Sequence, residues 1–83
     1  MNLYAEAENK VKAIIDENGY ISVEDYSQLF ALNFTGYVSL SGDFTETLAK
    51  RMEQNIRDNR VYLSLGLKYN KEKDILCSMV KLR

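Results

Sequence analysis

Apolar residues recur at helical spacing in the first part of the chain, and polar residues occupy the positions between them. The stripe comprises Leu3, Ala7, Val11, Ile14 and Ile15. Because residues three and four apart share one face of an α-helix, this pattern predicts an amphipathic helix from Leu3 to Asn18. The helix should stop at Asn18-Gly19, since glycine readily adopts the left-handed conformation found just beyond a helix end.

A second helix is predicted to open at Ser22 and to end near Leu32. Ser22 and Asp25 have the spacing of a capping box, in which each side chain hydrogen-bonds the backbone N–H of the other residue. The segment 33–41 that follows is rich in aromatic and β-branched residues, which favour extended structure. We therefore expect a short strand in this segment, or a loop that contains one.

A third amphipathic helix is predicted after the chain break at Ser41-Gly42. Asp43 and Glu46 suit a second capping box at its start. Apolar residues then continue at helical spacing to about Asn59, which gives this helix a buried stripe and a solvated face.

The C-terminal part of the chain alternates between apolar and polar residues. Val61–Tyr69 places every second residue on an apolar face, as a strand with one buried side does. A polar turn is predicted at 70–73, and Asp74–Leu82 is predicted to be the returning strand. Together these segments predict a β-hairpin.

The elements combine into one small α+β domain over residues 1–83, with three helices and a small antiparallel sheet that ends in the hairpin. Hydrophobic residues form 46% of the chain, enough for a core, which argues against disorder. No apolar run approaches the ~20 residues of a membrane span. The N-terminal residues lack the features of a signal peptide, and the lone Cys77 allows no internal disulfide. We therefore expect a cytoplasmic protein.

Catalysis and cofactor binding are not expected. The chain has no histidine, so the usual general base near neutral pH and the commonest zinc ligand are both missing. Cys77 lies mid-strand among apolar neighbours, and the four glycines are too scattered to form a phosphate-binding loop. The sequence therefore predicts a protein that is not an enzyme, with no cofactor and no metal.

The charges are divided unevenly along the chain. Residues 1–48 carry eight acidic and two basic side chains, whereas residues 49–83 carry nine basic and four acidic ones. The formal net charge of −1 thus conceals an acidic half and a basic half. Because charge asymmetry of this kind bears on partners, it yields two competing hypotheses of function.

The leading hypothesis is a small inhibitor or adaptor that docks on a protein through an acidic, tyrosine-rich surface. In brevity and acidity the chain resembles small proteins of phages and mobile elements, including anti-CRISPR inhibitors, and the resemblance implies a nucleic-acid-handling enzyme as target. The alternative is that these acids only keep surface helices soluble. The residues of the predicted surface are Tyr4, Glu6, Glu8, Asp16, Glu17, Tyr20, Glu24, Asp25 and Tyr26.

The second hypothesis is a DNA-binding regulator. The order helix, helix, short strand, helix, hairpin resembles that of the winged-helix family, and a short extended Tyr20-Ile21 after Gly19 fits its opening. The resemblance implies that the third helix reads DNA and the hairpin touches phosphates. About eleven residues separate Leu32 from Phe44, however, which is long for a helix–turn–helix link. The cations concerned are Lys50, Arg51, Arg57, Arg60, Lys68, Lys71 and Lys73, with Lys81 further along the hairpin.

A third hypothesis is a structural subunit that forms a homodimer through its last strand. Ile75, Cys77 and Met79 fall on one face of that strand, while the opposite face is also apolar. A strand that is apolar on both faces needs cover on both sides, from its own helices or from a second chain. The sequence does not decide between these two kinds of cover.

Overall fold

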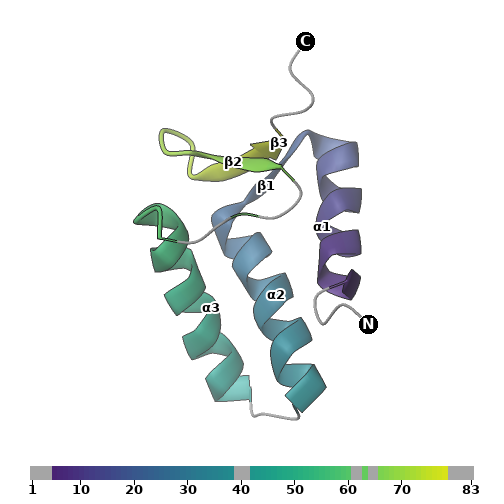
Figure 1. Ribbon diagram of the computed structural model, residues 1–83, viewed down its shortest axis with the longest axis vertical. Helices are drawn as coiled ribbons and strands as arrows, with labels where there is room; N and C mark the ends of the chain where they lie inside the picture. The colour runs from purple at the N-terminus through teal and green to yellow at the C-terminus, as the bar shows by residue number, and fades with distance from the viewer. Residues whose placement is uncertain (1–4, 39–41, 61–62, 64–65, 79–83) are drawn as a thin grey trace.

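The computed structural model describes residues 5–38, 42–60, 63 and 66–78, with the backbone alone for 36–38 and 42. The described part is an α+β fold of three helices and a three-stranded antiparallel sheet, as predicted (Figure 1). In chain order the elements are α1 (Ala5–Asn18), β1 (Tyr20–Ser22), α2 (Val23–Val38), α3 (Gly42–Arg57), β2 (Leu67–Asn70) and β3 (Ile75–Ser78).

Three helices stand side by side, and the sheet covers one end of them (Figure 1). The helix α2 lies between α1 and α3, and consecutive helices run in opposite directions. The core joins all three helices to the inner face of the sheet, and Tyr26 stacks on Phe30 within it, with 4.6 Å between ring centroids. Its buried members are Ala7, Val11, Ile15, Ile21, Val23, Tyr26, Phe30, Ile56, Leu67 and Leu76.

The sheet has the order β1-β3-β2, so the last strand lies in the middle. Leu76 of β3 pairs with Ile21 on one side and Tyr69 on the other. Because side chains alternate across a strand, this row faces the helices, and Leu76 is fully buried. Cys77, one position along, pairs with Tyr20 and Lys68 on the opposite face of the sheet.

The junction of α1, β1 and α2 follows the sequence prediction closely. Gly19 has a φ of 85° and donates its N–H to the carbonyl of Ile15 at 2.7 Å, which ends α1. Ser22 then accepts the N–H of Asp25 on its Oγ at 3.0 Å, which caps the start of α2. Two residues separate Gly19 from Ser22, so the connection between α1 and α2 contains only Gly19 and the short strand β1.

The prediction of a strand within 33–41 was wrong, because α2 continues to Val38. The contact of Thr35 with α3 explains why this segment is helical although its residues favour a strand. Its side chain is 3% exposed, and its hydroxyl donates to the Ala31 carbonyl at 2.9 Å and accepts from Thr45 of α3 at 2.6 Å. Three residues, 39–41, therefore lie between α2 and α3, in place of the eleven expected.

The helix α3 ends at Arg57, two residues before the predicted boundary. Asn59 takes the left-handed conformation, with a φ of 58°. Its N–H bonds the Ile56 carbonyl at 3.0 Å, and the N–H of Arg60 bonds the Asn55 carbonyl at 2.8 Å. This pair of bonds is a Schellman motif, which satisfies the last carbonyls of the helix.

The hairpin is shorter than predicted within the described residues. β2 spans Leu67–Asn70, and the positions 61, 62, 64 and 65 of the predicted strand lie outside the described residues, as do 79–83. Asp74, predicted to begin the returning strand, instead belongs to the turn because its φ is 55°. The predicted alternation is confirmed at Leu67, which is buried, and at Tyr69, which is partly buried.

Candidate functional site

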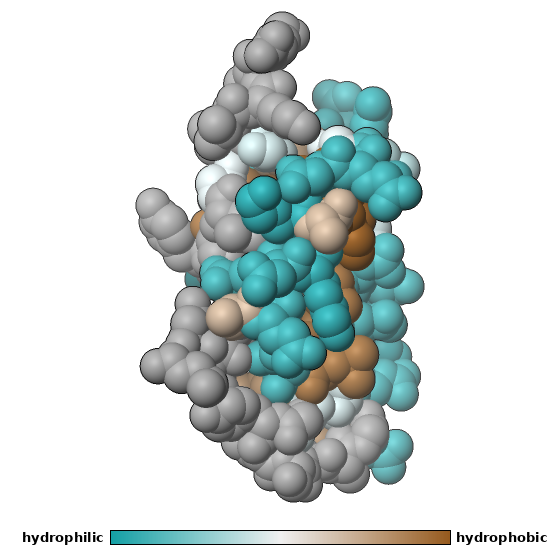
Figure 2. Space-filling model, turned by 90° about the vertical axis from the view of Figure 1, so that its right-hand side faces the viewer, coloured by the Kyte–Doolittle hydropathy of each residue, from teal (hydrophilic) through white to brown (hydrophobic). Residues whose placement is uncertain are grey.

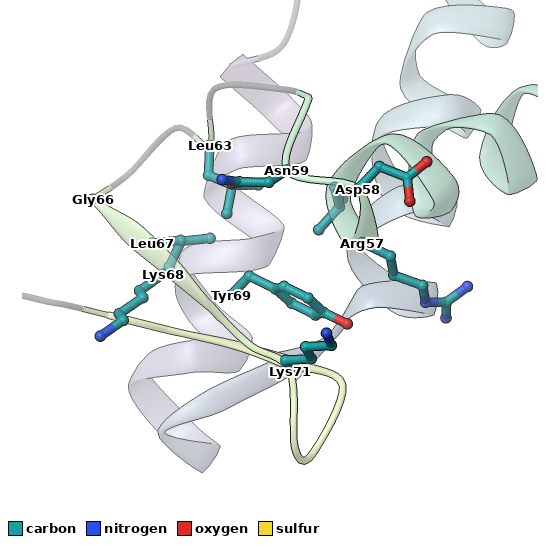
Figure 3. Close-up of a pocket in the computed structure, with 10 residues that line it drawn as sticks. Arg57, Asp58, Asn59, Leu63, Gly66, Leu67, Lys68, Tyr69 and Lys71 are labelled. Atoms are coloured by element: carbon teal, nitrogen blue, oxygen red, sulfur yellow. The ribbon is translucent and has the colours of Figure 1, made fainter.

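An open hollow lies between the C-terminal end of α3 and the β-hairpin, with a volume of about 650 Å³ (Figure 3). We call it the hairpin hollow. Its floor contains Ile56, Leu63 and Leu67, and polar side chains surround it. The lining residues are Ile56, Arg57, Asp58, Asn59, Leu63, Gly66, Leu67, Lys68, Tyr69 and Lys71.

A network around Asp74 joins the hairpin to α3. Arg57 donates to both carboxylate oxygens of Asp74, from Nε at 3.1 Å and from Nη2 at 2.8 Å. Tyr69 donates its hydroxyl to Asp74 Oδ1 at 2.8 Å, and Glu53 approaches Arg57 Nη1 at 3.2 Å. The fork of the guanidinium matches the two oxygens of the carboxylate, so this contact fixes direction as well as distance.

The network shifts the titration of its members. Hydrogen bonds from Arg57, and then from Tyr69, hold the pKa of Asp74 below its usual value. The hydrogen bond to Asp74, with burial, raises the pKa of Tyr69. The same carboxylate raises the pKa of Arg57, which therefore stays charged throughout the physiological range. A carboxylate, a guanidinium and a neutral phenol are thus the stable species here.

The local backbone explains how Asp74 reaches this position. The turn 71–74 joins the paired residues Asn70 and Ile75, and Asn70 Oδ1 accepts the N–H of Lys73 at 3.2 Å. Aspartate tolerates the left-handed conformation better than most residues, which suits the φ of 55° at Asp74. The Asp74 carbonyl also accepts the N–H of Val23, at 3.4 Å, so the turn contacts the start of α2 as well.

Three predicted nucleic-acid-binding residues line the hairpin hollow: Arg57, Lys68 and Lys71. With Asp58 as the acidic member of the lining, they sum to a charge of +2. Lys71 and the Tyr69 hydroxyl lie on the side toward Arg57, whereas Lys68 points away from them (Figure 3). The structure thereby brings together cations that lie up to 14 positions apart in the sequence.

The other predicted cations lie around this hollow or along α3. Lys73 is exposed in the same turn as Lys71, and Arg60 is exposed just after α3. Arg51 is exposed one to two turns before the end of α3. Lys50 instead pairs with Glu46 at 3.5 Å. The predicted Lys81 lies outside the described residues.

The acidic residues of α1 do not form a uniformly acidic surface. Glu6 pairs with Lys10 at 3.7 Å, and Asp16 pairs with Lys12 at 3.0 Å. Figure 2 shows that the face of the molecule on the α1 side is largely hydrophilic. Glu17 is exposed at the end of the helix, and the remaining acidic residue, Glu8, is half-buried.

The other residues of the predicted acidic surface are dispersed. The prediction that Tyr26 lies on this surface was wrong. The residue is 6% exposed, because its ring packs in the core beside Phe30. Tyr20 is 48% exposed on the outer face of the sheet. Asp25 is exposed at the start of α2, and Glu24 faces α3. The predicted Tyr4 lies outside the described residues.

A second depression runs between α2 and α3, with a volume of about 420 Å³. We call it the α2–α3 groove. It combines residues from the acidic and basic halves of the sequence, so neither charge count nor spacing along the chain predicted it. The lining residues are Glu24, Gln28, Leu32, Thr45, Glu46, Ala49, Lys50 and Glu53.

The predicted oligomer interface falls on the outer face of the sheet. Ile75 and Cys77 are half-buried there, and Tyr20 lies beside Cys77 in the neighbouring strand. Leu76 faces the helices instead, which supply the cover predicted for that side of the strand. The third interface residue, Met79, lies outside the described residues.

The described part of the chain has neither a metal-binding cluster nor a membrane-spanning helix. No three His, Cys, Asp or Glu side chains there come together in a way that suits a metal ion. None of the described helices has the length and apolar character needed to cross a membrane. In the comparisons with known proteins, no family model matches the chain, and neither does any curated protein or solved structure.

Proposed function

We propose that this protein is a non-enzymatic nucleic-acid-binding protein whose hairpin end contacts the phosphate backbone. The observation that carries the proposal is the set of exposed cations at the hairpin end: Lys68 and Lys71 line the hairpin hollow, Lys73 lies in the adjoining turn, and Arg60 follows α3. Phosphate contacts by Lys and Arg supply most of the sequence-independent affinity for nucleic acids. A concave, cationic surface suits the convex backbone of such a ligand.

The distribution of ion pairs supports this proposal. Among the described cations of the predicted nucleic-acid-binding set, Lys50 and Arg57 have carboxylate partners. The exposed cations in or beside the hollow that form no ion pair with described residues are Arg60, Lys68, Lys71 and Lys73. Cations without carboxylate partners are available to displace the counterions of a phosphate backbone, and salt dependence follows from that displacement.

The order of elements also supports a nucleic-acid ligand. Helix, strand, helix, helix and hairpin, with the first strand beside the last, resembles the winged-helix arrangement. In a helix–turn–helix the two helices cross at about 90–120°. Here α2 and α3 lie side by side in opposite directions (Figure 1). We therefore propose that the hairpin end contacts phosphates, and that α3 does not enter the major groove as a reading helix.

A titration of isotope-labelled protein with a 12-base-pair duplex at low salt tests this proposal. The largest amide shifts are expected around Asn59, Lys68 and Lys71, which line the hollow. The double variant Lys68→Gln/Lys71→Gln should weaken binding by about tenfold or more, because it removes two phosphate contacts. The control Lys12→Gln removes a cation from α1 and should change affinity less than twofold, within the range of ~0–1 kcal/mol for a surface charge. Equal losses in both variants would contradict the proposed site.

A further inference from the structure

The α2–α3 groove carries one large apolar side chain that the fold leaves uncovered. Leu32 is 58% exposed, more than any other large hydrophobic residue among those described. It lies at the wall of the groove, with Gln28 and Glu24 one and two turns before it on the same face of α2. A single exposed leucine is common on protein surfaces, so it counts here because it borders a groove that a ligand could fill.

The shape of the groove suits a helix. Positions 24, 28 and 32 follow one face of α2 over about 12 Å, at 1.5 Å per residue. The antiparallel helix α3 supplies the opposite wall with Glu46, Lys50 and Glu53. Between the walls lies Ala49, whose small side chain is 3% exposed and lets a ligand approach closely. In helix-in-groove recognition the apolar face of a helix packs against the apolar side chains of a groove, which here are Leu32 and Ala49.

The charge of the groove is opposite to that of the hairpin hollow. Three carboxylates and one ammonium group line it, which sum to −2. Glu46 pairs with Lys50, and Glu53 pairs with Arg57, but Glu24 forms no ion pair with a described residue. The charge that the groove offers to a ligand is therefore that of Glu24, which favours a basic ligand.

We propose that the α2–α3 groove binds a basic amphipathic helix of a protein partner. In this arrangement an apolar side chain of the partner covers Leu32, and a Lys or Arg side chain of the partner lies against Glu24. The proposal is independent of the nucleic-acid site, because the two surfaces differ in charge and share no lining residue. The ion pair between Glu53 of the groove and Arg57 of the hollow, at 3.2 Å, connects the two sites.

The test uses the intact protein and two 18-residue helical peptides as probes. One peptide has leucines at helical spacing with lysines at the flanking positions, and the other has glutamate in place of every lysine. Binding is measured by fluorescence anisotropy at low salt, and the site by amide shifts. We expect the lysine peptide to bind and to shift the amides of Gln28, Leu32 and Ala49, whereas the glutamate peptide should bind at least tenfold more weakly.

Matched variants identify the groove as the site. Glu24→Lys should weaken binding of the lysine peptide by about fivefold or more, because it replaces attraction by repulsion, and Leu32→Ser should weaken it similarly. The control Glu17→Lys makes the same change as Glu24→Lys, and Tyr20→Ser removes another large exposed side chain outside the groove; both should alter affinity less than twofold. Both target residues are exposed, so these variants should fold, which circular dichroism checks.

Each of the following results would overturn the proposal. The first is that the lysine peptide does not bind at millimolar concentration. The second is that both peptides bind equally, which would show that the leucines of the peptides cause binding and that their charge has no effect. The third is that the shifts map to the outer face of the sheet, or that the control variants lose as much affinity as the groove variants.

Discussion

Arg57 and Asp74 form a two-pronged ion pair across 17 positions of sequence, with N–O distances of 3.1 and 2.8 Å. One partner ends α3 and the other ends the hairpin turn, so the pair fixes the angle between the two elements that border the hairpin hollow. Tyr69 adds a third hydrogen bond to the same carboxylate, at 2.8 Å. The pair is partly exposed, with 35% of the Arg57 side chain and 46% of the Asp74 side chain accessible. Its main role is therefore to orient the hairpin rather than to supply much stability.

Asp74→Asn should lower the free energy of unfolding by about 1 kcal/mol, the upper range for an exposed ion pair with good geometry. Asparagine tolerates the left-handed backbone at this position, so the change removes the charge and one hydrogen-bond acceptor without straining the turn. Urea unfolding measures the effect. Asp16→Asn breaks an ordinary pair within α1 and should cost at most about 0.5 kcal/mol. A loss at Asp74 no larger than the loss at Asp16 would show that the network adds nothing to the hairpin.

The same network predicts how stability depends on pH. Because the pKa of Asp74 is lowered by folding, its contribution is complete above its unfolded value near 3.8 and is lost as the pH falls through the lower folded value. Asp74→Asn should therefore flatten the acid limb of a plot of unfolding free energy against pH. An unchanged acid limb would assign acid unfolding to other carboxylates.

The hydrogen bond from Tyr69 to Asp74 predicts how the free energy of unfolding depends on alkaline pH. Its pKa is raised by folding, so its contribution is present below about pH 10. That contribution is lost as the pH rises through the higher folded value, because a phenolate cannot donate to Asp74. Tyr69→Phe should flatten the alkaline limb and leave the acid limb less affected. Thermal unfolding between pH 8 and 11 provides the comparison.

Ser27→Ala should stabilise the protein by about 1 kcal/mol. Ser27 is fully buried in α2, and its hydroxyl has no hydrogen-bond partner among the described residues. Removing a buried, unsatisfied hydroxyl recovers its desolvation cost, and alanine is also the better helix former. The same substitution at Ser22 removes the cap of α2 and should cost about 1 kcal/mol. If Ser27→Ala destabilises the fold, its hydroxyl has a partner that the described contacts do not include.

Asn59→Gly should raise the melting temperature, whereas Asn59→Ala should lower it. Asn59 has a φ of 58° in the Schellman motif that ends α3. Glycine takes this conformation without steric cost, and a residue with an ordinary Cβ does so at about 1 kcal/mol. Because Asn59 also lines the hairpin hollow, the two variants are compared by calorimetry before their ligand binding is measured. Equal melting temperatures would contradict the assigned role of the cap.

Local signals in the sequence predicted the parts of the fold that depend on neighbouring residues. Ser22 and Asp25 predicted the cap of α2, and Gly19 predicted the end of α1, because both depend on a few adjacent positions. The extension of α2 to Val38 was missed. Its last residues favour strands by themselves, and the contact of Thr35 with Thr45 of α3 is not visible in local propensity.

The candidate sites depended more strongly on tertiary structure. The hairpin lysines were predicted as phosphate contacts from their place in the order of elements. The pairing of Arg57 with Asp74 was not, since an arginine and an aspartate 17 positions apart carry no periodic signal. The α2–α3 groove was missed for the same reason: its walls come from the acidic and the basic half of the sequence, and only packing brings Glu24 and Glu53 together.

The salt dependence of binding to a fluorescein-labelled 20-base-pair duplex tests the central proposal most directly. Four cations in or beside the hairpin hollow form no ion pair with described residues, so the plot of log K against log salt should have a slope of about −3 to −4. Lys68→Gln/Lys71→Gln should reduce that slope by about 2, and Lys12→Gln should leave it unchanged. A slope no steeper than about −1, or no binding at low salt, would contradict phosphate contact at the hairpin end.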